Sequence, residues 1–247
     1  MRFLTTWILT ILLGANLIAC SDDSAVPSYE QARTEFFQQK KAEKSSSGFS
    51  KQDYAIMAKS AEKLRQALPN PGLLVGAKAP NFVLGNAYGN GIRLSDVLSK
   101  GPVILVFYRG AWCPFCNLHL NTLQKAMPLF EKYQAQLIAV TPQTPDKSLP
   151  QINKNALTFE VLSDLDDEVM YLYKMYHRVD DELNEVYRKN GIDIEAYNGA
   201  GRRVLPVPGT YIIDQNSVIR GVHADTDYKQ RMEVSTILSI LEEIQQQ

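Results

Sequence analysis

Residues 102–116 read PVILVFYRGAWCPFC and carry the strongest fold signal in the chain. Pro102–Tyr108 is a continuous apolar run, typical of a strand that is buried on both faces of a sheet. A helical pattern follows, roughly from Pro114 to Tyr133, and Pro128 within it predicts a kink or a break. The segment therefore predicts a central strand, then a loop with two cysteines, then a long helix.

The elements around this segment indicate an α/β fold. Strands and helices alternate at first, and a hairpin and a final helix close the chain, which predicts a three-layer sandwich with a central mixed sheet. Residues 177–207 are polar and rich in tyrosine, and we expect them to form an insertion over the sheet edge. The other expected elements are strands at residues 81–84, 92–94, 137–141, 158–162, 210–213 and 218–222, and helices near residues 166–176 and 230–244.

The chain divides into three expected parts. Residues 1–19 have the character of a signal peptide, residues 20–72 form a tether and a helical extension, and residues 73–247 form the α/β domain. The extension carries two helical patterns, roughly at residues 29–44 and 51–68. It either holds the domain away from a membrane or serves as a packing or dimer element.

The N-terminus predicts export and a lipid anchor. A short positive start is followed by an apolar run from Phe3 to Ile18, which is too short to cross a bilayer comfortably. The run ends in Leu-Ile-Ala-Cys20, which resembles the bacterial lipobox, whose cysteine is lipidated and becomes the new N-terminus. Ser21, which follows this cysteine, resembles the residue at the same position of lipoproteins that are sorted to an outer membrane. We expect a lipid-anchored, extracytoplasmic protein of the cell envelope that faces the periplasm, although an ordinary cleaved signal with a chance cysteine is the alternative.

Composition and cysteine count narrow the chemistry. With 45% hydrophobic and 21% charged residues and a net charge of -1, the 247-residue chain is globular, and nothing in its charge suggests a nucleic acid partner. Three cysteines are too few for a disulfide framework. If Cys20 is acylated, Cys113 and Cys116 are the only free thiols, in a compartment that is often oxidising.

The Cys-Pro-Phe-Cys element predicts an ionised thiol at a helix start. With the helix beginning here, Cys113 is the N-cap, Pro114 takes the first helical position, and Cys116 lies at the third. Backbone N–H groups and the positive helix end would then stabilise a Cys113 thiolate, lowering its pKa below the free value of about 8.5. Arg109 nearby adds positive charge. Helix capping therefore points to Cys113 as the attacking sulfur, with Cys116 closing a short disulfide.

Redox chemistry is the role that we expect for this cysteine pair, and the alternatives are a structural role or a metal-binding role. The pair could form a purely structural disulfide or a chance pair of core cysteines. It could also be half of a zinc site or the thiolate ligands of a copper-binding thioredoxin-fold protein, completed by histidine. The histidines are His119, His177 and His223. We expect His119 on the surface or tuning the pair, and His223 at a strand end in a surface or capping role.

From about Gly76 to the C-terminus the chain resembles the alkyl hydroperoxide reductase/thiol-specific antioxidant family, the peroxiredoxin-like branch of the thioredoxin superfamily. The resemblance implies a thioredoxin-like fold and a thiol-dependent peroxidase with no organic cofactor. Its partners would be a hydroperoxide and a reducing dithiol protein similar to thioredoxin. The matching words are GAKAPNF at 76–82, FY at 107–108 with CPFC at 113–116, LSD at 162–164, and LPVPGTYIID at 205–214.

The register of this resemblance assigns the cysteines differently from helix capping. Laid on the family's active loop without gaps, Cys116 falls on the peroxide-reactive cysteine and Cys113 on a threonine. Arg109 falls where proline is usual. We therefore predict a catalytic set of Cys113, Cys116 and Arg109 and no metal, with Trp112 and Pro114 in support, although Trp112 is as readily explained by packing.

A second departure from the family lies near the late strand. The family's other anchor is an arginine, and the corresponding position here is Pro208, which instead resembles the cis-proline of thioredoxins that receives the substrate chain. Arg202 or Arg203 is the candidate replacement for the missing arginine.

Two mechanisms remain open from the sequence. In a peroxidase, the Cys116 thiolate attacks the O–O bond and Cys113 condenses with the resulting sulfenic acid. In a thiol-disulfide oxidoreductase, an exposed Cys113 attacks a client protein disulfide and Cys116 resolves the mixed disulfide. The resemblance over the whole domain favours the peroxidase, whereas the local residues favour dithiol exchange.

Overall fold

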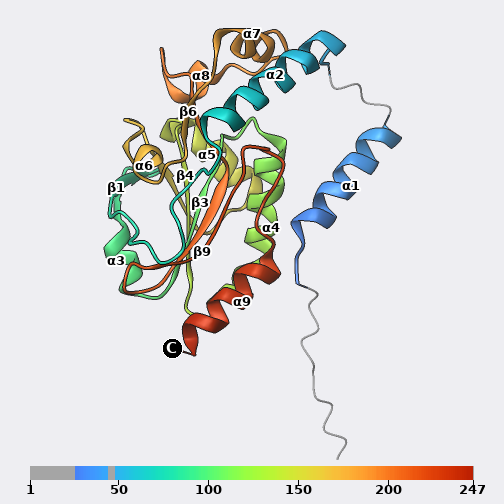
Figure 1. Cartoon of the computed structure of the whole chain (residues 1–247). Helices are drawn as coiled ribbons and strands as arrows, with labels where there is room; N and C mark the ends of the chain where they lie inside the picture. The colour runs from blue at the N-terminus through green and yellow to red at the C-terminus, as the bar shows by residue number, and fades with distance from the viewer. Residues whose placement is uncertain (1–25, 44–47, 247) are drawn as a thin grey trace, which may run out of the picture.

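The computed structural model describes residues 26–43 and 48–246. The predicted signal peptide and Cys20 lie outside these residues. Within them, no helix is both long enough and apolar enough to cross a membrane. The chain forms a central sheet flanked by helices, with two further helices from the N-terminal extension at its periphery (Figure 1).

A mixed seven-stranded sheet forms the middle layer, in the order β2-β1-β5-β4-β3-β8-β9. The three central strands β5, β4 and β3 are parallel to one another, and every other pairing is antiparallel. The expected mixed sheet is thus confirmed. Its strands are β1 (Val83–Asn86), β2 (Gly91–Arg93), β3 (Val103–Phe107), β4 (Gln136–Thr141), β5 (Glu160–Ser163), β8 (Gly209–Ile213) and β9 (Ile219–Ala224).

Helices cover both faces of the sheet, which explains why β3 is apolar throughout. Ile104 and Val106 join one buried cluster, and Leu105 and Phe107 join the other, as alternation along a strand requires. The first cluster lies under α4, α5 and α9, and the second under α3 and α6. The predicted three layers are therefore confirmed. These helices are α3 (Leu94–Leu98), α4 (Pro114–Glu131), α5 (Pro145–Asn155), α6 (Glu168–Leu172) and α9 (Val234–Gln245).

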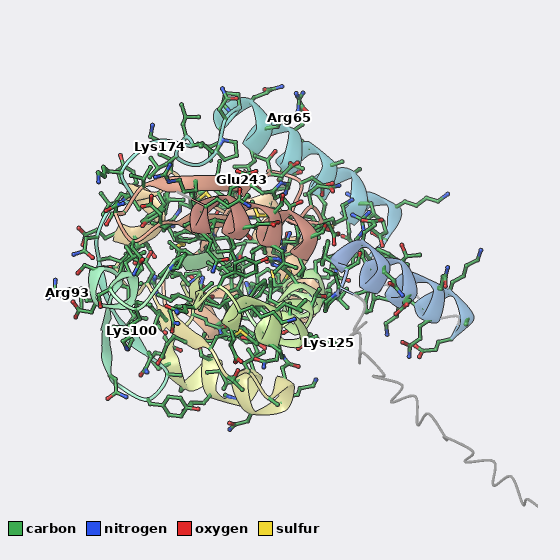
Figure 2. The ribbon with its side chains drawn as sticks, turned by 90° about the horizontal axis from the view of Figure 1, so that it is seen from below. Arg65, Arg93, Lys100, Lys125, Lys174 and Glu243 are labelled. Atoms are coloured by element: carbon green, nitrogen blue, oxygen red, sulfur yellow. The ribbon has the colours of Figure 1, made fainter. Side chains whose placement is uncertain are left out.

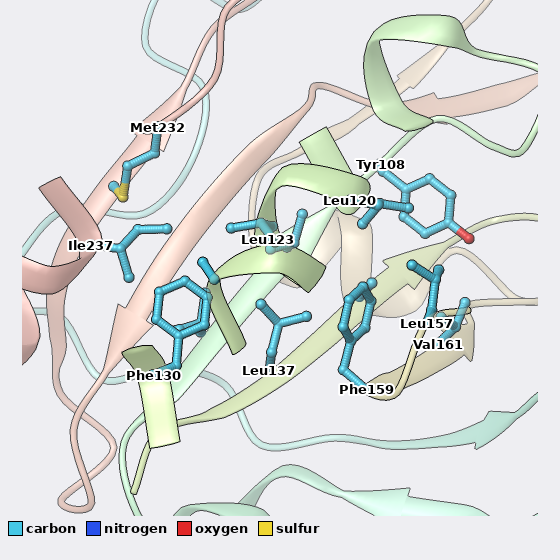
Figure 3. Packing of buried hydrophobic residues seen from close by; sticks show 14 of the residues in the cluster. Tyr108, Leu120, Leu123, Phe130, Leu137, Leu157, Phe159, Val161, Met232 and Ile237 are labelled. Carbon is cyan, nitrogen blue, oxygen red and sulfur yellow. The ribbon is translucent and has the colours of Figure 1, made fainter. Parts of the chain in front are cut away.

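Helix α4 runs without interruption through Pro128, so of the predicted kink or break, the break is wrong. Leu123 before the proline and Phe130 after it are both fully buried in one cluster, beside Ile237 of α9 and Leu137 of β4 (Figure 3). Proline inside a helix costs about 3 kcal/mol. Burying a large apolar side chain on each side of it offsets a cost of that order.

The two predicted N-terminal helices are present and pack on different parts of the domain. Helix α1 (Tyr29–Ala42) lies along α4, and α2 (Lys51–Ala67) lies along α7 (Asp181–Lys189) (Figure 1). Ser50 and Asp53 form a reciprocal capping box at the start of α2, which explains why that helix begins there. Figure 2 shows Arg65 of α2, like Arg93 and Lys125 of the domain, on the outside of the molecule.

Residues 177–207 do form an insertion, and it has a small core of its own. Strand β6 (Tyr176–Arg178) pairs with β7 (Val204–Pro206), and α7 and α8 (Ile194–Asn198) lie between them in sequence. Val179, Tyr187, Ile194 and Leu205 are buried together, with Met57 of α2 and Trp112 packed against them. The insertion thus packs against both α2 and the loop that carries the cysteines.

Candidate active site

The cysteine pair lies where the carboxyl end of β3 passes into α4. Cys113 is the N-cap of α4, Pro114 is its first residue, and Cys116 lies in its first turn, as the predicted helix start requires. Both cysteines are free thiols, and each side chain is only 1% exposed. The oxidoreductase mechanism requires an exposed Cys113, and in this reduced structure Cys113 is buried.

Gly110 allows the loop before the cysteines to turn. Its φ of +145° is a conformation that residues with a side chain rarely adopt. A Cβ at this position would lie 2.7 Å from Nε1 of Trp112 and 3.3 Å from Oε1 of Gln143. The glycine in the sequence therefore permits the close approach of the Trp112 ring to the loop.

The sulfur that is stabilised as a thiolate is Cys116. The Cys113 side chain makes no capping hydrogen bond, and its thiol donates to the Cys116 sulfur instead. Burial raises the pKa of Cys113 well above the ordinary thiol value, and the hydrogen bond and charge of Cys116 add to this. Burial opposes ionisation of Cys116 too, but the Cys113 thiol, the Arg231 charge and the Arg109 backbone N–H outweigh it and lower its pKa. The capping hydrogen bonds predicted to stabilise a Cys113 thiolate are therefore not formed.

Arg231 is the direct cationic partner of this thiolate. It lies in the segment before α9, is buried, and places Nη2 3.4 Å from Sγ of Cys116. Its Nη1 donates to the carbonyls of Tyr228 and Gln230, both at 2.6 Å. Sequence reasoning missed Arg231, because a lone arginine in a polar stretch carries no sign that it is buried against a residue 115 positions away.

The two arginines proposed as replacements for the family's arginine lie elsewhere. Arg202 pairs with Asp167 and donates to the carbonyl of Asp164, and Arg203 pairs with Asp181. Both therefore serve the insertion and its neighbouring loop. Arg231, which follows the edge strand β9 in sequence, takes the position beside the thiolate that was predicted for them.

Arg109 contributes to the site mainly through its backbone. Its N–H donates to the Cys116 sulfur, while its guanidinium donates to the Tyr187 hydroxyl at 2.7 Å. The guanidinium carbon lies 4.8 Å from the Trp112 ring centre and 4.6 Å from that of Tyr228. These aromatic faces stabilise the buried cation. Within the described residues no carboxylate lies within ion-pair distance of Arg109.

Buried amide side chains hold the cysteine loop in place through hydrogen bonds. Gln143 accepts the Ala111 N–H at 2.9 Å and donates to the Tyr108 hydroxyl at 3.1 Å. Asn117 donates to the carbonyls of Ala111 and Cys113, at 2.7 and 3.1 Å. The loop thus has few ways to shift, which holds the cysteine backbone in place. Sequence reasoning did not single out either amide.

Of the histidines, His119 differs from the surface position expected for it, whereas His223 lies near the end of a strand as expected. His119 is 1% exposed, not on the surface, and burial and the nearby Arg231 charge hold its pKa well below the usual value. His223 is partly buried on β9, and burial lowers its pKa as well. In the described part of the chain, no three His, Cys, Asp or Glu side chains are grouped so that they could hold a metal ion. The zinc and copper hypotheses therefore lack a third ligand there.

A cavity of about 460 Å³ opens beside the site, between the domain, α2 and the insertion. Arg109, Tyr187, Tyr228 and Pro208 are among its lining residues. Pro208 is thus near the site, but all peptide bonds of the described residues are trans, so its likeness to a cis-proline is not seen. The lining is mostly apolar, and it includes Met57, Ala61, Leu64 and Ala67 of α2 and Leu183 of α7.

A family model described as the AhpC/TSA family matches residues 75–222, well over half of the chain. The chain belongs to this family. The match includes β3, the cysteine loop and α4. It begins after α1 and α2 and ends before Arg231.

Relatives of this chain have two different named activities. Thiol-disulfide oxidoreductase ResA of Geobacillus kaustophilus is 29% identical over 160 residues, covering 64% of this chain and 74% of that protein. Putative peroxiredoxin bcp of Helicobacter pylori strain J99 is 36% identical over 104 residues, covering 42% of this chain and 68% of that protein. The chain is thus a thiol-dependent redox protein. Its relatives include both a thiol-disulfide oxidoreductase and a putative peroxiredoxin.

Solved structures confirm the thioredoxin-like fold. The peroxidoxin BcpB of Mycobacterium tuberculosis superposes with a TM-score of 0.55 at 19% identity, covering 71% of this chain and 99% of that one. A putative protein disulfide isomerase of Bacteroides thetaiotaomicron gives a TM-score of 0.51 at 15% identity, covering 72% and 95%. At such identities the likeness concerns the fold alone.

Proposed function

We propose that the protein is a peroxiredoxin-like peroxidase in which Cys116 attacks a hydroperoxide and Cys113 resolves the product. The observation that carries the proposal is the 3.4 Å contact between Nη2 of Arg231 and Sγ of Cys116. A cation and two further donors on a buried sulfur favour the thiolate, which is the nucleophilic form. The same donors are placed to stabilise negative charge as an O–O bond breaks.

The proposed reaction consumes one hydroperoxide and yields one disulfide. The Cys116 thiolate attacks the terminal oxygen of ROOH, the O–O bond breaks, and Cys116 becomes a sulfenic acid while RO⁻ leaves. The Cys113 thiol, which its raised pKa keeps protonated, gives its proton to RO⁻ and releases ROH. The Cys113 thiolate then attacks the Cys116 sulfur, forming the disulfide and releasing hydroxide.

A reducing dithiol protein completes the proposed cycle by thiol-disulfide exchange with the Cys113–Cys116 disulfide, which returns both thiols. We also propose, from the lipobox-like segment alone, that Cys20 carries a lipid and tethers the protein outside the cytoplasm. In that location the protein would act on peroxides in the cell envelope.

Thiol-disulfide exchange with client proteins is the second candidate, and the ResA relative favours it. That activity requires the disulfide bond of a client protein to approach the attacking sulfur along the axis of its S–S bond. Cys113 is 1% exposed and has a raised pKa, so it combines poor access with a small thiolate fraction. A peroxide is small enough to reach a buried sulfur after side-chain movements, which is why we favour the peroxidase.

Stopped-flow reaction with hydrogen peroxide tests the proposal in the wild type, Cys113→Ser and Cys116→Ser. We expect Cys113→Ser to form a trappable sulfenic acid more slowly than the wild type but faster than a free thiol, because Cys116 and Arg231 remain while the acidic proton of Cys113 is lost. We expect Cys116→Ser to react no faster than a free thiol. If no variant outruns a free thiol and Cys116→Ser instead traps mixed disulfides with client proteins, the second candidate is correct.

A further inference from the structure

Helix α1 lies outside the region matched by the family, yet it is tied to the segment that carries Arg231. The backbone N–H groups of Tyr29 and Glu30, at its start, donate to the carboxylate of Glu233 at 3.0 and 2.8 Å. A carboxylate at a helix N-terminus is also favoured by the helix dipole. Because Glu233 follows Arg231 by two residues, this contact holds one end of the arginine's segment.

Tyr29 holds the other end of the same segment. Its side chain is 2% exposed, and its hydroxyl donates to the carbonyl of Lys229 at 2.7 Å. Its ring centre lies 5.9 Å from the guanidinium carbon of Arg231, within the range of a cation–π contact. The ring also meets His119 of α4 edge to face, at 5.7 Å. Tyr29 therefore packs between α4 and the residues on both sides of Arg231.

The position of the Arg231 side chain depends on this segment. Nη1 of Arg231 is held by two carbonyls of the segment itself, which leaves Nη2 to reach Cys116. A shift of the segment would therefore move the guanidinium with it. Since the contact with Sγ is 3.4 Å, a displacement of about 1 Å would remove it as a hydrogen bond.

We infer that Tyr29 and Glu233 are positioning residues, through which α1 holds Arg231 against the Cys116 thiolate. The extension would then be part of the active site and not only a spacer. The inference rests on the proposed function only for its effect on peroxide turnover. Its effect on the ionisation of Cys116 holds whatever substrate the thiolate attacks.

Another aromatic residue of α1 provides a matched control. Phe37 contacts Phe115 of α4 with ring centres 5.8 Å apart, and among the residues that the structure describes its ring contacts do not include Tyr228 or Arg231. Phe37→Ala therefore weakens the docking of α1 while the Tyr29 and Glu233 contacts to the arginine's segment remain. If α1 acted only through general stability, this variant and Tyr29→Ala would behave alike.

The test is the rate of Cys116 alkylation by iodoacetamide against pH, with the modified peptide identified by mass spectrometry in the full chain. Because alkylation follows the thiolate, its midpoint reports the pKa of Cys116. We expect Tyr29→Ala and Glu233→Gln each to raise the midpoint by about one pH unit, a loss of thiolate that approaches tenfold well below the midpoint. Tyr29→Phe keeps the ring and should shift it less, and Phe37→Ala should leave it unchanged.

Thermal unfolding of each variant shows whether it is folded, and Glu233→Gln serves as the mild variant should Tyr29→Ala fail to fold. An equal shift in Phe37→Ala, or no shift in Tyr29→Ala and Glu233→Gln, overturns the inference. A raised midpoint in Tyr29→Ala and Glu233→Gln alone, in a protein that proves inert to peroxides, would support the inference and overturn the proposed function.

Discussion

Two segments meet at the Cys116 sulfur, and they stabilise its charge in different ways. The loop at residues 109–116 supplies a backbone N–H from Arg109 and the Cys113 thiol, both fixed by the strand, the helix start and buried amides. The segment at residues 228–233 supplies a side-chain cation, Arg231, that is placed by contacts with α1. The first contribution is local to the motif, whereas the second depends on tertiary packing.

This difference shows why two arginines beside the same thiolate are not equivalent. The Arg109 side chain is directed into an aromatic cage and the Tyr187 hydroxyl, so its charge acts on Cys116 from a distance. The Arg231 side chain touches the sulfur. Removing the Arg231 side chain should therefore cost more than removing that of Arg109, although Arg109 lies closer to the cysteines in sequence.

The largest effect should come from Arg231→Met, which keeps the length of the side chain but removes its charge and its donors. We expect the second-order rate with hydrogen peroxide at neutral pH to fall about a hundredfold, as when a donor to a developing oxyanion is lost. Stopped-flow kinetics measure the rate. Arg231→Lys, which restores a charge, should recover part of it, and an unchanged rate in Arg231→Met would exclude the arginine from the reaction.

A smaller effect is expected for Arg109→Met, because the backbone N–H on Cys116 remains. Loss of the guanidinium charge should raise the pKa of Cys116 by about one unit and lower the rate by a factor that approaches ten at pH values well below that pKa. The same kinetics, run in parallel with Arg231→Met, measure the ratio of the two losses. A larger loss for Arg109→Met would reverse the ranking of the two segments.

The smallest effect should come from the cavity wall. Leu64→Trp on α2 should partly fill the cavity and slow cumene hydroperoxide by about threefold to tenfold relative to hydrogen peroxide. Ala55→Trp is the control, since Ala55 is exposed on the opposite side of the same helix. Competition kinetics between the two peroxides give the ratio, and equal slowing of both would mean that peroxides do not approach through the cavity.

Sequence patterns predicted the elements whose burial is decided locally. The apolar run of β3 and the Cys-Pro start of α4 place the cysteines correctly, because strand burial and proline at the first helical position have short-range signals. Helix α5 was missed, since Pro145 and Pro150 within eleven residues favour a loop. Both prolines nevertheless lie within the observed helix.

The charge state of the cysteines could not be obtained in the same way. The sequence correctly predicted that Cys113 is the N-cap of α4. Its thiol, however, donates a hydrogen bond to the Cys116 sulfur, which also lies beside the Arg231 guanidinium. His119 was expected on the surface because nothing near it in sequence reveals that Tyr29 of α1 covers that face of α4. Long-range packing of the segment before α9 thus places Arg231 beside Cys116, which favours the thiolate there.

The pH dependence of cysteine alkylation in the wild-type protein tests this account most directly, with each cysteine followed separately by mass spectrometry. The Cys113 thiol and the Arg231 charge lower the pKa of Cys116 below the ordinary thiol value, so Cys116 should react readily at neutral pH and lose reactivity only as the pH falls through this lowered pKa. The pKa of Cys113 is raised, so Cys113 should stay unreactive at neutral pH. Preferential alkylation of Cys113 at pH 6 would contradict the assignment of Cys116 as the attacking thiolate.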